Sequence, residues 1–195
     1  MVPVNLPNQL TLGRILLVPL VVGFLISTNS THSLLAAGLF AAAALTDWLD
    51  GYLARRRRQV TTLGKLLDPV ADKLLVAAAL ISLVQVGRVG AWIAVLIIGR
   101  EFAVTGLRMI SATQGAVIPA SDLAKYKTAS QYVAVTLLIL EKNVPAALEA
   151  EYRYLSHGML WGALILTVVS GVEYFVRFYR RADIEALVRE EDRWH

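Results

Sequence analysis

Apolar residues form long runs along this 195-residue chain, and short groups of polar and charged residues separate them. Runs of this length, without the alternation typical of strands, favour helices in a membrane. They predict six transmembrane helices, at about residues 10–27, 33–54, 69–86, 91–110, 128–140 and 154–178. A short interfacial segment, residues 1–10, precedes the first helix. The predicted fold is a single all-α integral membrane domain over residues 1–195.

The composition agrees with a small membrane protein: 56% of the residues are hydrophobic, and the net charge is +4. The absence of cysteine excludes disulfides and thiol chemistry. The cations lie in short blocks between apolar runs, and no DNA- or RNA-binding motif is present, so we expect no nucleic-acid partner. HExxH, P-loop, GxGxxG and Ser-His-Asp signatures are also absent, and the histidines have no partner spacing.

Residues 47–72 carry the densest group of acidic residues between apolar runs. Asp47 and Asp50 are spaced i,i+3, and Asp68 and Asp72 are spaced i,i+4, so each pair lies on one face of a helix. If the two helices form a hairpin, all four carboxylates point to one place. Carboxylates in hydrophobic helices are costly and usually mark a functional site.

Four converging carboxylates repel one another unless a cation lies between them. Such an oxygen-rich site suits Mg²⁺ or Mn²⁺ and is large enough for two ions. Gly51 and Ala54, on or near the aspartate face, leave space for a ligand, and Arg55 suits a phosphate. Two alternatives stay open: Asp68 and Pro69 are also typical of a helix start, and the arginines at 55–58 are also typical of a membrane-border anchor.

The whole stretch resembles the signature of the CDP-alcohol phosphotransferase family. It reads Asp50-Gly51-x2-Ala54-Arg55-x8-Gly64-x3-Asp68-x3-Asp72, preceded by Asp47, with no departure at any fixed position. The resemblance implies a membrane enzyme that transfers a phosphoalcohol unit from a CDP-activated donor to a hydroxyl acceptor and releases CMP. It implies that Asp47, Asp50 and Asp68 bind two divalent cations and that Asp72 is the general base, which can also touch metal.

Three further segments resemble the phosphatidylglycerophosphate synthase branch of this family. They comprise Asn8, Thr11 and Arg14; Arg100, Glu101 and Arg108; and Lys125, Lys127, Thr128 and Gln131. The resemblance implies that the first segment, with Gly51, Ala54, Arg55 and Gly64, lines the CDP-donor site. It implies that Arg100, Arg108 and Lys125 bind the phosphate of the acceptor, for which Lys127 is a further candidate.

The residues themselves leave alternatives for these cations. Arg100 and Arg108 are eight residues apart and share a helix face, which suits a phosphate dianion. Glu101 can instead form an ion pair with a cation elsewhere. Arg14 is also typical of a side chain that reaches the lipid headgroups, and Lys127 of a membrane-border anchor.

The expected reaction transfers the phosphatidyl group of CDP-diacylglycerol to glycerol 3-phosphate, giving phosphatidylglycerophosphate and CMP. Another acceptor, such as phosphatidylglycerol, serine or an inositol phosphate, stays an alternative within the family. A divalent-metal transporter is an alternative from a different class. It should carry its charges near the membrane midplane and lack a basic cradle for a pyrophosphate.

The distribution of cations predicts the orientation. Cations are frequent in the loop at residues 55–65, around residues 125–127 and from residue 177 onward, whereas the opposite side has Arg88, Lys142 and Arg153. The positive-inside rule then places both termini and the aspartates on the cytoplasmic side of the cytoplasmic (inner) membrane. The family resemblance suggests a homodimer among membrane lipids, for which Gly158-x3-Gly162 is a weak packing motif.

Overall fold

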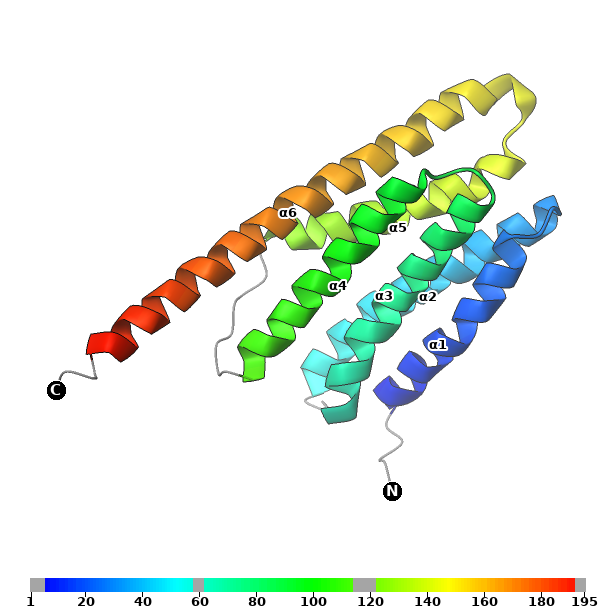
Figure 1. Cartoon of the computed structure of the whole chain (residues 1–195). Helices are drawn as coiled ribbons and strands as arrows, with labels where there is room; N and C mark the ends of the chain where they lie inside the picture. The colour runs from blue at the N-terminus through cyan, green and yellow to red at the C-terminus, as the bar shows by residue number, and fades with distance from the viewer. Residues whose placement is uncertain (1–5, 58–61, 114–121, 192–195) are drawn as a thin grey trace.

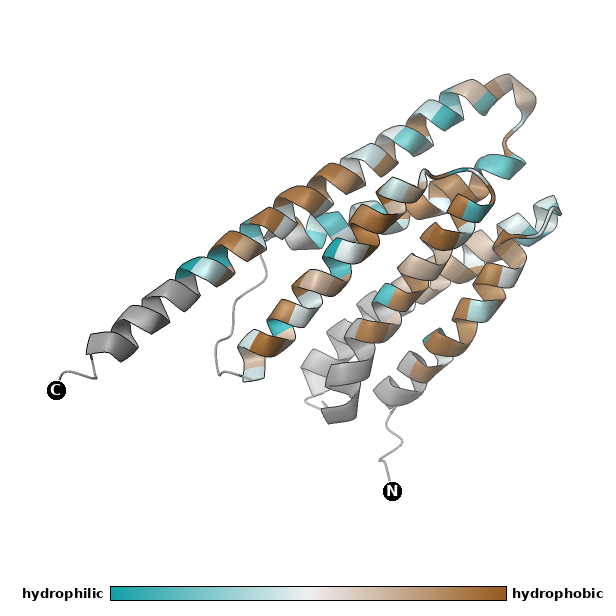
Figure 2. Ribbon diagram, in the orientation of Figure 1, coloured by the Kyte–Doolittle hydropathy of each residue, from teal (hydrophilic) through white to brown (hydrophobic). Residues whose placement is uncertain are grey.

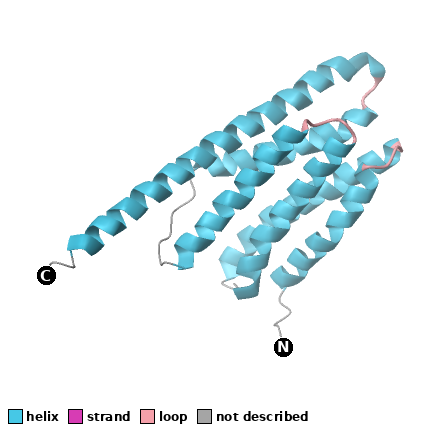
Figure 3. Ribbon diagram, viewed as in Figure 1, coloured by secondary structure: helices cyan, strands magenta, loops and turns pink. Residues whose placement is uncertain are grey.

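The protein is described here from a computed structural model. The model describes the backbone of residues 6–57, 62–113 and 122–191, and the side chains of residues 12–46, 70–71, 73–113, 123 and 125–180. Over these ranges the fold is helical and contains no strand (Figures 1 and 3). The predicted all-α class is confirmed.

Six α-helices account for most of the described chain. They are α1 (Leu6–Leu25), α2 (Ser30–Arg57), α3 (Thr62–Gln85), α4 (Ala91–Thr113), α5 (Asp122–Leu140) and α6 (Glu149–Glu191), with short 3-10 helices η1 (Glu141–Asn143) and η2 (Ala146–Leu148) before α6. Each predicted transmembrane segment corresponds to one of these helices, although segments 10–27 and 69–86 extend one or two residues past the ends of α1 and α3. Residues 6–10, predicted as interfacial, belong to α1, whereas residues 1–5 lie outside the described residues.

Helix α3 begins earlier than the sequence pattern suggested. It runs continuously from Thr62, so Asp68 and Pro69 lie within the helix. The interpretation of these two residues as a helix start is therefore wrong. An N-cap residue lies outside the helix that it caps, and here the helical backbone extends to both sides of Asp68.

Local signals explain the two short turns at one end of the bundle. The Asn29 side chain accepts a hydrogen bond of 2.9 Å from the backbone N–H of Thr31, which caps the start of α2. After α3, Gly87 adopts a φ of 75°, and the N–H groups of Gly87 and Arg88 donate to the carbonyls of Val84 and Leu83. This is a Schellman motif, which ends a helix with a residue that favours glycine.

One main core connects the helices, and a smaller cluster around Val104 and Tyr174 lies between α4 and α6. The main core contains large side chains, such as Phe40 of α2 and Leu75 of α3, and alanines such as Ala36, Ala79 and Ala134 at positions of close approach. Small residues let neighbouring helix backbones pack closely. Helix α3 packs against α1 and α4, and α6 packs against α4 and α5 (Figure 1). The end where α1 begins is also where α2 ends and α3 begins, and α4 and α6 run toward it.

Apolar side chains also cover much of the outer surface. Leu16 of α1, Val95 of α4 and Ile165 of α6 are all more than half exposed. Figure 2 shows apolar residues along most of these helices, with polar ones concentrated near the turns and at a few internal positions. By length and composition, Ala146–Arg180 is long and apolar enough to cross a membrane, and Leu12–Leu25, Ser30–Thr46 and Lys73–Gln85 form shorter apolar helices.

Candidate functional site

The aspartates lie on two neighbouring helices. Asp47 and Asp50 are on α2, and Asp68 and Asp72 are on α3, on either side of the connection at residues 58–61. The two helices contact each other. Their aspartate side chains lie outside the described residues, so the convergence of the carboxylates stays a prediction. Four carboxylates on two contacting helices are a donor set that fits oxygen-preferring divalent cations.

Most of the predicted donor-site residues also lie outside the described side chains. This group contains Asn8, Thr11, Gly51, Ala54, Arg55 and Gly64. Arg14 is described, and it is only 3% exposed, on the side of α1 that faces the bundle. A side chain that simply reached the headgroups from a lipid-facing position would be more exposed. The burial of Arg14 agrees with an interior role, which stays a prediction.

Glu101 of α4 is the centre of the polar group that the structure describes best. Its side chain is 12% exposed, and its Oε1 accepts hydrogen bonds from Lys127 Nζ and, at 3.1 Å, from Arg100 Nη1. Gln131 Nε2 lies 3.5 Å from the same oxygen. We call Arg100, Glu101, Lys127 and Gln131 the Glu101 cluster. The ion pair of Glu101 with a distant cation, left open by the sequence, is thus present, and the cation is Lys127.

Side chains of α6 accept hydrogen bonds from this cluster. Ser170 Oγ accepts a hydrogen bond of 2.9 Å from Arg100 Nη2, and Thr167 Oγ1 accepts one of 2.9 Å from Gln131 Nε2. A Cβ atom on Gly171 would lie 2.9 Å from Arg100 Cγ, which is closer than real Cβ atoms approach. Glycine at this position therefore allows the Arg100 side chain to lie along α6. Sequence reasoning missed Thr167, Ser170 and Gly171, because small residues in an apolar helix carry no sign of a polar partner.

Arg100 and Arg108 both contact α6, so they share one face of α4, and their spacing predicted this shared face. The Arg108 guanidinium is 5.7 Å from the centre of the Tyr174 ring, within the range of a cation–π contact, and its side chain is exposed. The buried Nε of Arg100 has no hydrogen-bond partner among the described residues. A buried donor of this kind usually has a partner, such as a water or a ligand.

The two predicted lysines differ in their surroundings. Lys125 is exposed, and Lys127 is buried in the Glu101 cluster. Both are near the start of α5. Burial of the Lys127 ammonium excludes the interpretation of Lys127 as a membrane-border anchor, because an anchoring lysine keeps its charge in water.

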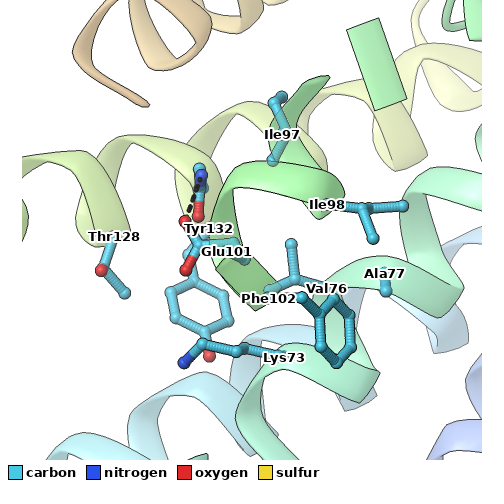
Figure 4. A pocket seen from close by; sticks show the side chains of 10 residues that line it. Lys73, Val76, Ala77, Ile97, Ile98, Glu101, Phe102, Thr128 and Tyr132 are labelled. Atoms are coloured by element: carbon cyan, nitrogen blue, oxygen red, sulfur yellow. Dashed lines mark hydrogen bonds between the residues drawn. The ribbon is translucent and has the colours of Figure 1, made fainter. Parts of the chain in front are cut away.

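A small cavity adjoins the Glu101 carboxylate between α3, α4 and α5. It measures about 50 Å³, and its polar lining comes from Lys73, Glu101, Thr128 and Gln131. Figure 4 shows Glu101 in the upper part of the view and Lys73 in the lower part, with the Tyr132 ring between them. Lys73 directly follows Asp72 in the chain, so this cavity connects the polar side of α4 to the helix that carries two of the aspartates.

Comparison with known proteins identifies the family. A profile of the family described as CDP-alcohol phosphatidyltransferase matches residues 4–169. The chain belongs to this family. Within it, a Bacillus subtilis protein named CDP-diacylglycerol–glycerol-3-phosphate 3-phosphatidyltransferase is 45% identical over 183 residues, covering 88% of this chain and 93% of its own.

Two other relatives of this CDP-alcohol phosphatidyltransferase bear on the acceptor. A Rickettsia typhi protein with the same name is 40% identical over 171 residues, covering 88% of this chain and 95% of its own. A rice protein named cardiolipin synthase (CMP-forming) is 39% identical over 158 residues, covering 73% of this chain and 48% of its own.

Proposed function

We propose that the protein is a phosphatidylglycerophosphate synthase, which transfers the phosphatidyl group of CDP-diacylglycerol to glycerol 3-phosphate. The observation that carries this proposal is the identity of 45% with the Bacillus subtilis enzyme over 88% of the chain. The cationic face of α4 supports it, because Arg100 and Arg108 suit an acceptor that carries a phosphate.

In the proposed reaction the acceptor hydroxyl attacks the β-phosphorus of the donor. A bond forms between the hydroxyl oxygen and this phosphorus, the bond from the phosphorus to the CMP oxygen breaks, and CMP leaves with the electron pair. Asp72 takes the hydroxyl proton as general base. The two products, phosphatidylglycerophosphate and CMP, account for all atoms of the donor and the acceptor.

Asp47, Asp50 and Asp68 are the proposed ligands of two divalent cations, Mg²⁺ or Mn²⁺. Asp72, four residues after Asp68 on α3, is the proposed base and can also touch metal. When bound, such ions neutralise charge that develops on the pyrophosphate and on the departing CMP. The described part of the chain provides the rest of the proposed acceptor site, in which Arg100, Arg108, Lys125 and Lys127 bind the phosphate of glycerol 3-phosphate. Residues of the signature and of α1 line the donor side.

The proposed setting is the cytoplasmic membrane, with all six helices crossing it and with both termini and the aspartates on the cytoplasmic side. The exposed apolar side chains of α1, α4 and α6 support contact with lipid. A homodimer is proposed as well. Gly158 and Gly162 support it, since both are exposed and a Cβ atom on either would meet nothing within 4 Å in the same chain.

A second candidate acceptor is phosphatidylglycerol. The similarity to the rice cardiolipin synthase favours it, although this chain covers only 48% of that protein. Phosphatidylglycerol has a phosphodiester with one charge, whereas glycerol 3-phosphate has a dianion. Two arginines on one face of α4 therefore favour glycerol 3-phosphate.

The test is CMP release by the purified protein in detergent with Mg²⁺ and CDP-diacylglycerol. We expect release that requires glycerol 3-phosphate and falls about a thousandfold or more in Asp72→Asn, because a general base contributes roughly 10²–10⁴-fold. Binding of Mn²⁺ should remain largely intact in that variant. Release with phosphatidylglycerol alone would change the acceptor, release without any acceptor would contradict the transfer, and full activity of Asp72→Asn would exclude its role as base.

A further inference from the structure

The Glu101 carboxylate forms ion pairs with two cations from different helices. Lys127 comes from α5, and its side chain is 5% exposed. The negative charge of Glu101 therefore offsets the desolvation cost of burying the Lys127 ammonium. Arg100 comes from α4 itself, is 13% exposed, and has a second partner in Ser170. Glu101 is therefore the one acidic side chain in the cluster that contacts both cations.

The carboxylate is in turn fixed through α6. Gln131 donates to Thr167 and lies against Glu101, and the hydroxyls of Thr167 and Ser170 donate 2.6 Å hydrogen bonds to the carbonyls of Ala163 and Leu166. Both hydroxyl groups thus have their oxygens oriented toward the Glu101 cluster. A carboxylate with this many oriented donors has little freedom to move.

The charges do not cancel within the cluster. Arg100 and Lys127 carry two positive charges against one negative charge, and the Arg100 Nε donor has no partner among the described residues. A buried surplus of positive charge with an unused donor suits an anion such as a phosphate. Glu101 itself does not suit that anion, because two negative groups repel each other.

We propose that Glu101 is a positioning residue for the acceptor phosphate: it fixes Arg100 and Lys127 in place without touching the substrate. This inference rests on the proposed function, since it assigns the bound anion to glycerol 3-phosphate. It differs from a merely structural ion pair, in which Glu101 neutralises Lys127 and the position of Arg100 is irrelevant to the acceptor.

Kinetics of Glu101→Gln separate these two roles. We expect the KM for glycerol 3-phosphate to rise about tenfold, while the KM for CDP-diacylglycerol changes less than about twofold. Glu101→Asp should recover part of the loss, since it keeps the charge. An equal rise in both KM values, or no change in either, would overturn the proposal.

A double variant removes the purely structural explanation. In Glu101→Gln with Lys127→Met, no buried ammonium lacks its counterion, so the melting temperature should return toward that of the wild type. The KM for glycerol 3-phosphate should nevertheless stay above that of Lys127→Met alone, because Arg100 still lacks its partner. A recovered melting temperature together with a KM equal to that of Lys127→Met alone would show that Glu101 is only structural.

Milder and matched variants guard against misfolding. Thr167→Val keeps the side-chain shape and removes the acceptor of the Gln131 hydrogen bond, so it should raise the same KM about twofold to threefold. Glu149→Gln removes the exposed partner of Arg153 at the other end of the bundle and should change neither KM. A larger effect of Glu149→Gln than of Thr167→Val would contradict the proposal.

A binding measurement separates failure of this inference from failure of the proposed function. Glycerol 3-phosphate should raise the melting temperature of the wild type, glycerol should not, and the shift should be lost in Glu101→Gln. Absence of glycerol 3-phosphate-dependent CMP release in the wild type would reject the proposed function. Normal release in the wild type, with an undiminished melting shift in Glu101→Gln, would reject the inference alone.

Discussion

In two charged clusters of this bundle, the cations have different hydrogen-bond partners. At the end with the short turns, Arg88 Nη1 donates to the backbone carbonyls of Leu138 and Ile139 at 2.7 and 3.1 Å, and Lys142 Nζ donates to that of Ser27 at 3.1 Å. Arg88 Nε also lies 4.0 Å from Glu141 Oε2. In the Glu101 cluster, the hydrogen bonds of the cations go to the side chains of Glu101 and Ser170. We call Arg88, Glu141 and Lys142 the Arg88 cluster.

The two arrangements have different causes. Helices α1 and α5 end near the Arg88 cluster, and the last carbonyls of a helix have no partner within it. Arg88 supplies donors and favourable charge to the last carbonyls of α5, at the negative end of its dipole. Lys142 donates to Ser27, two residues past the end of α1. In the Glu101 cluster the helices continue past the charges, so the backbone is already paired and the cations need other partners.

This difference indicates which cations can bind a ligand. A cation that caps a helix leaves carbonyls unsatisfied if it moves, whereas a cation paired with side chains can share its donors with an anion. Cavity volume alone would instead favour the Arg88 cluster as the ligand site. The hollow of about 570 Å³ beside Arg88, Glu141 and Lys142 is far larger than the cavity of about 50 Å³ beside Glu101.

Among the variants that test this distinction, Arg100→Met should have the largest effect. In Arg100→Met, kcat/KM for glycerol 3-phosphate should fall about a hundredfold, equivalent to about 2.7 kcal/mol, because a charge-assisted contact to the phosphate is lost. Initial rates of CMP release over a range of glycerol 3-phosphate concentrations measure it. A decrease no larger than that for CDP-diacylglycerol would place Arg100 outside the acceptor site.

Removal of Arg88 should affect stability and leave catalysis unchanged. Arg88→Met leaves the carbonyls at the end of α5 without their donor and should lower the free energy of unfolding by about 2 kcal/mol. Denaturant unfolding in detergent measures this loss. Arg153→Met is the control, since Arg153 is 61% exposed and its ion pair should contribute little. A raised KM for glycerol 3-phosphate in Arg88→Met would contradict the distinction between the two clusters.

Gly171→Ala should have the smallest effect. The added methyl group lies 2.9 Å from Arg100 Cγ, so the arginine has to shift away from α6. We expect the KM for glycerol 3-phosphate to rise about fivefold, equivalent to about 1 kcal/mol. Gly38→Ala on α2 is the matched control, because Gly38 is exposed and a Cβ atom there meets nothing within 4 Å. Equal kinetics for the two variants would show that the position of Arg100 is unimportant.

The sequence could predict much of the helical content and the face shared by Arg100 and Arg108. Apolar runs and i,i+4 spacing are local properties, and a helix expresses them regardless of its neighbours. The ion pair of Glu173 with Arg177, four residues apart on α6, is likewise a local contact within one helix. Local patterns failed at the start of α3, where Asp68 and Pro69 look like a cap although the helix continues through them.

Sequence by itself thus determined the helices, the family signature and the charges available to a site. Only the tertiary structure decided which charges meet: Glu101 with Lys127, Arg100 with Ser170, and Arg88 with the end of α5. The physical reason is that contacts between helices depend on their axial offset and rotation, which the packing of core side chains sets. The spacing of residues along one helix carries no information about that offset.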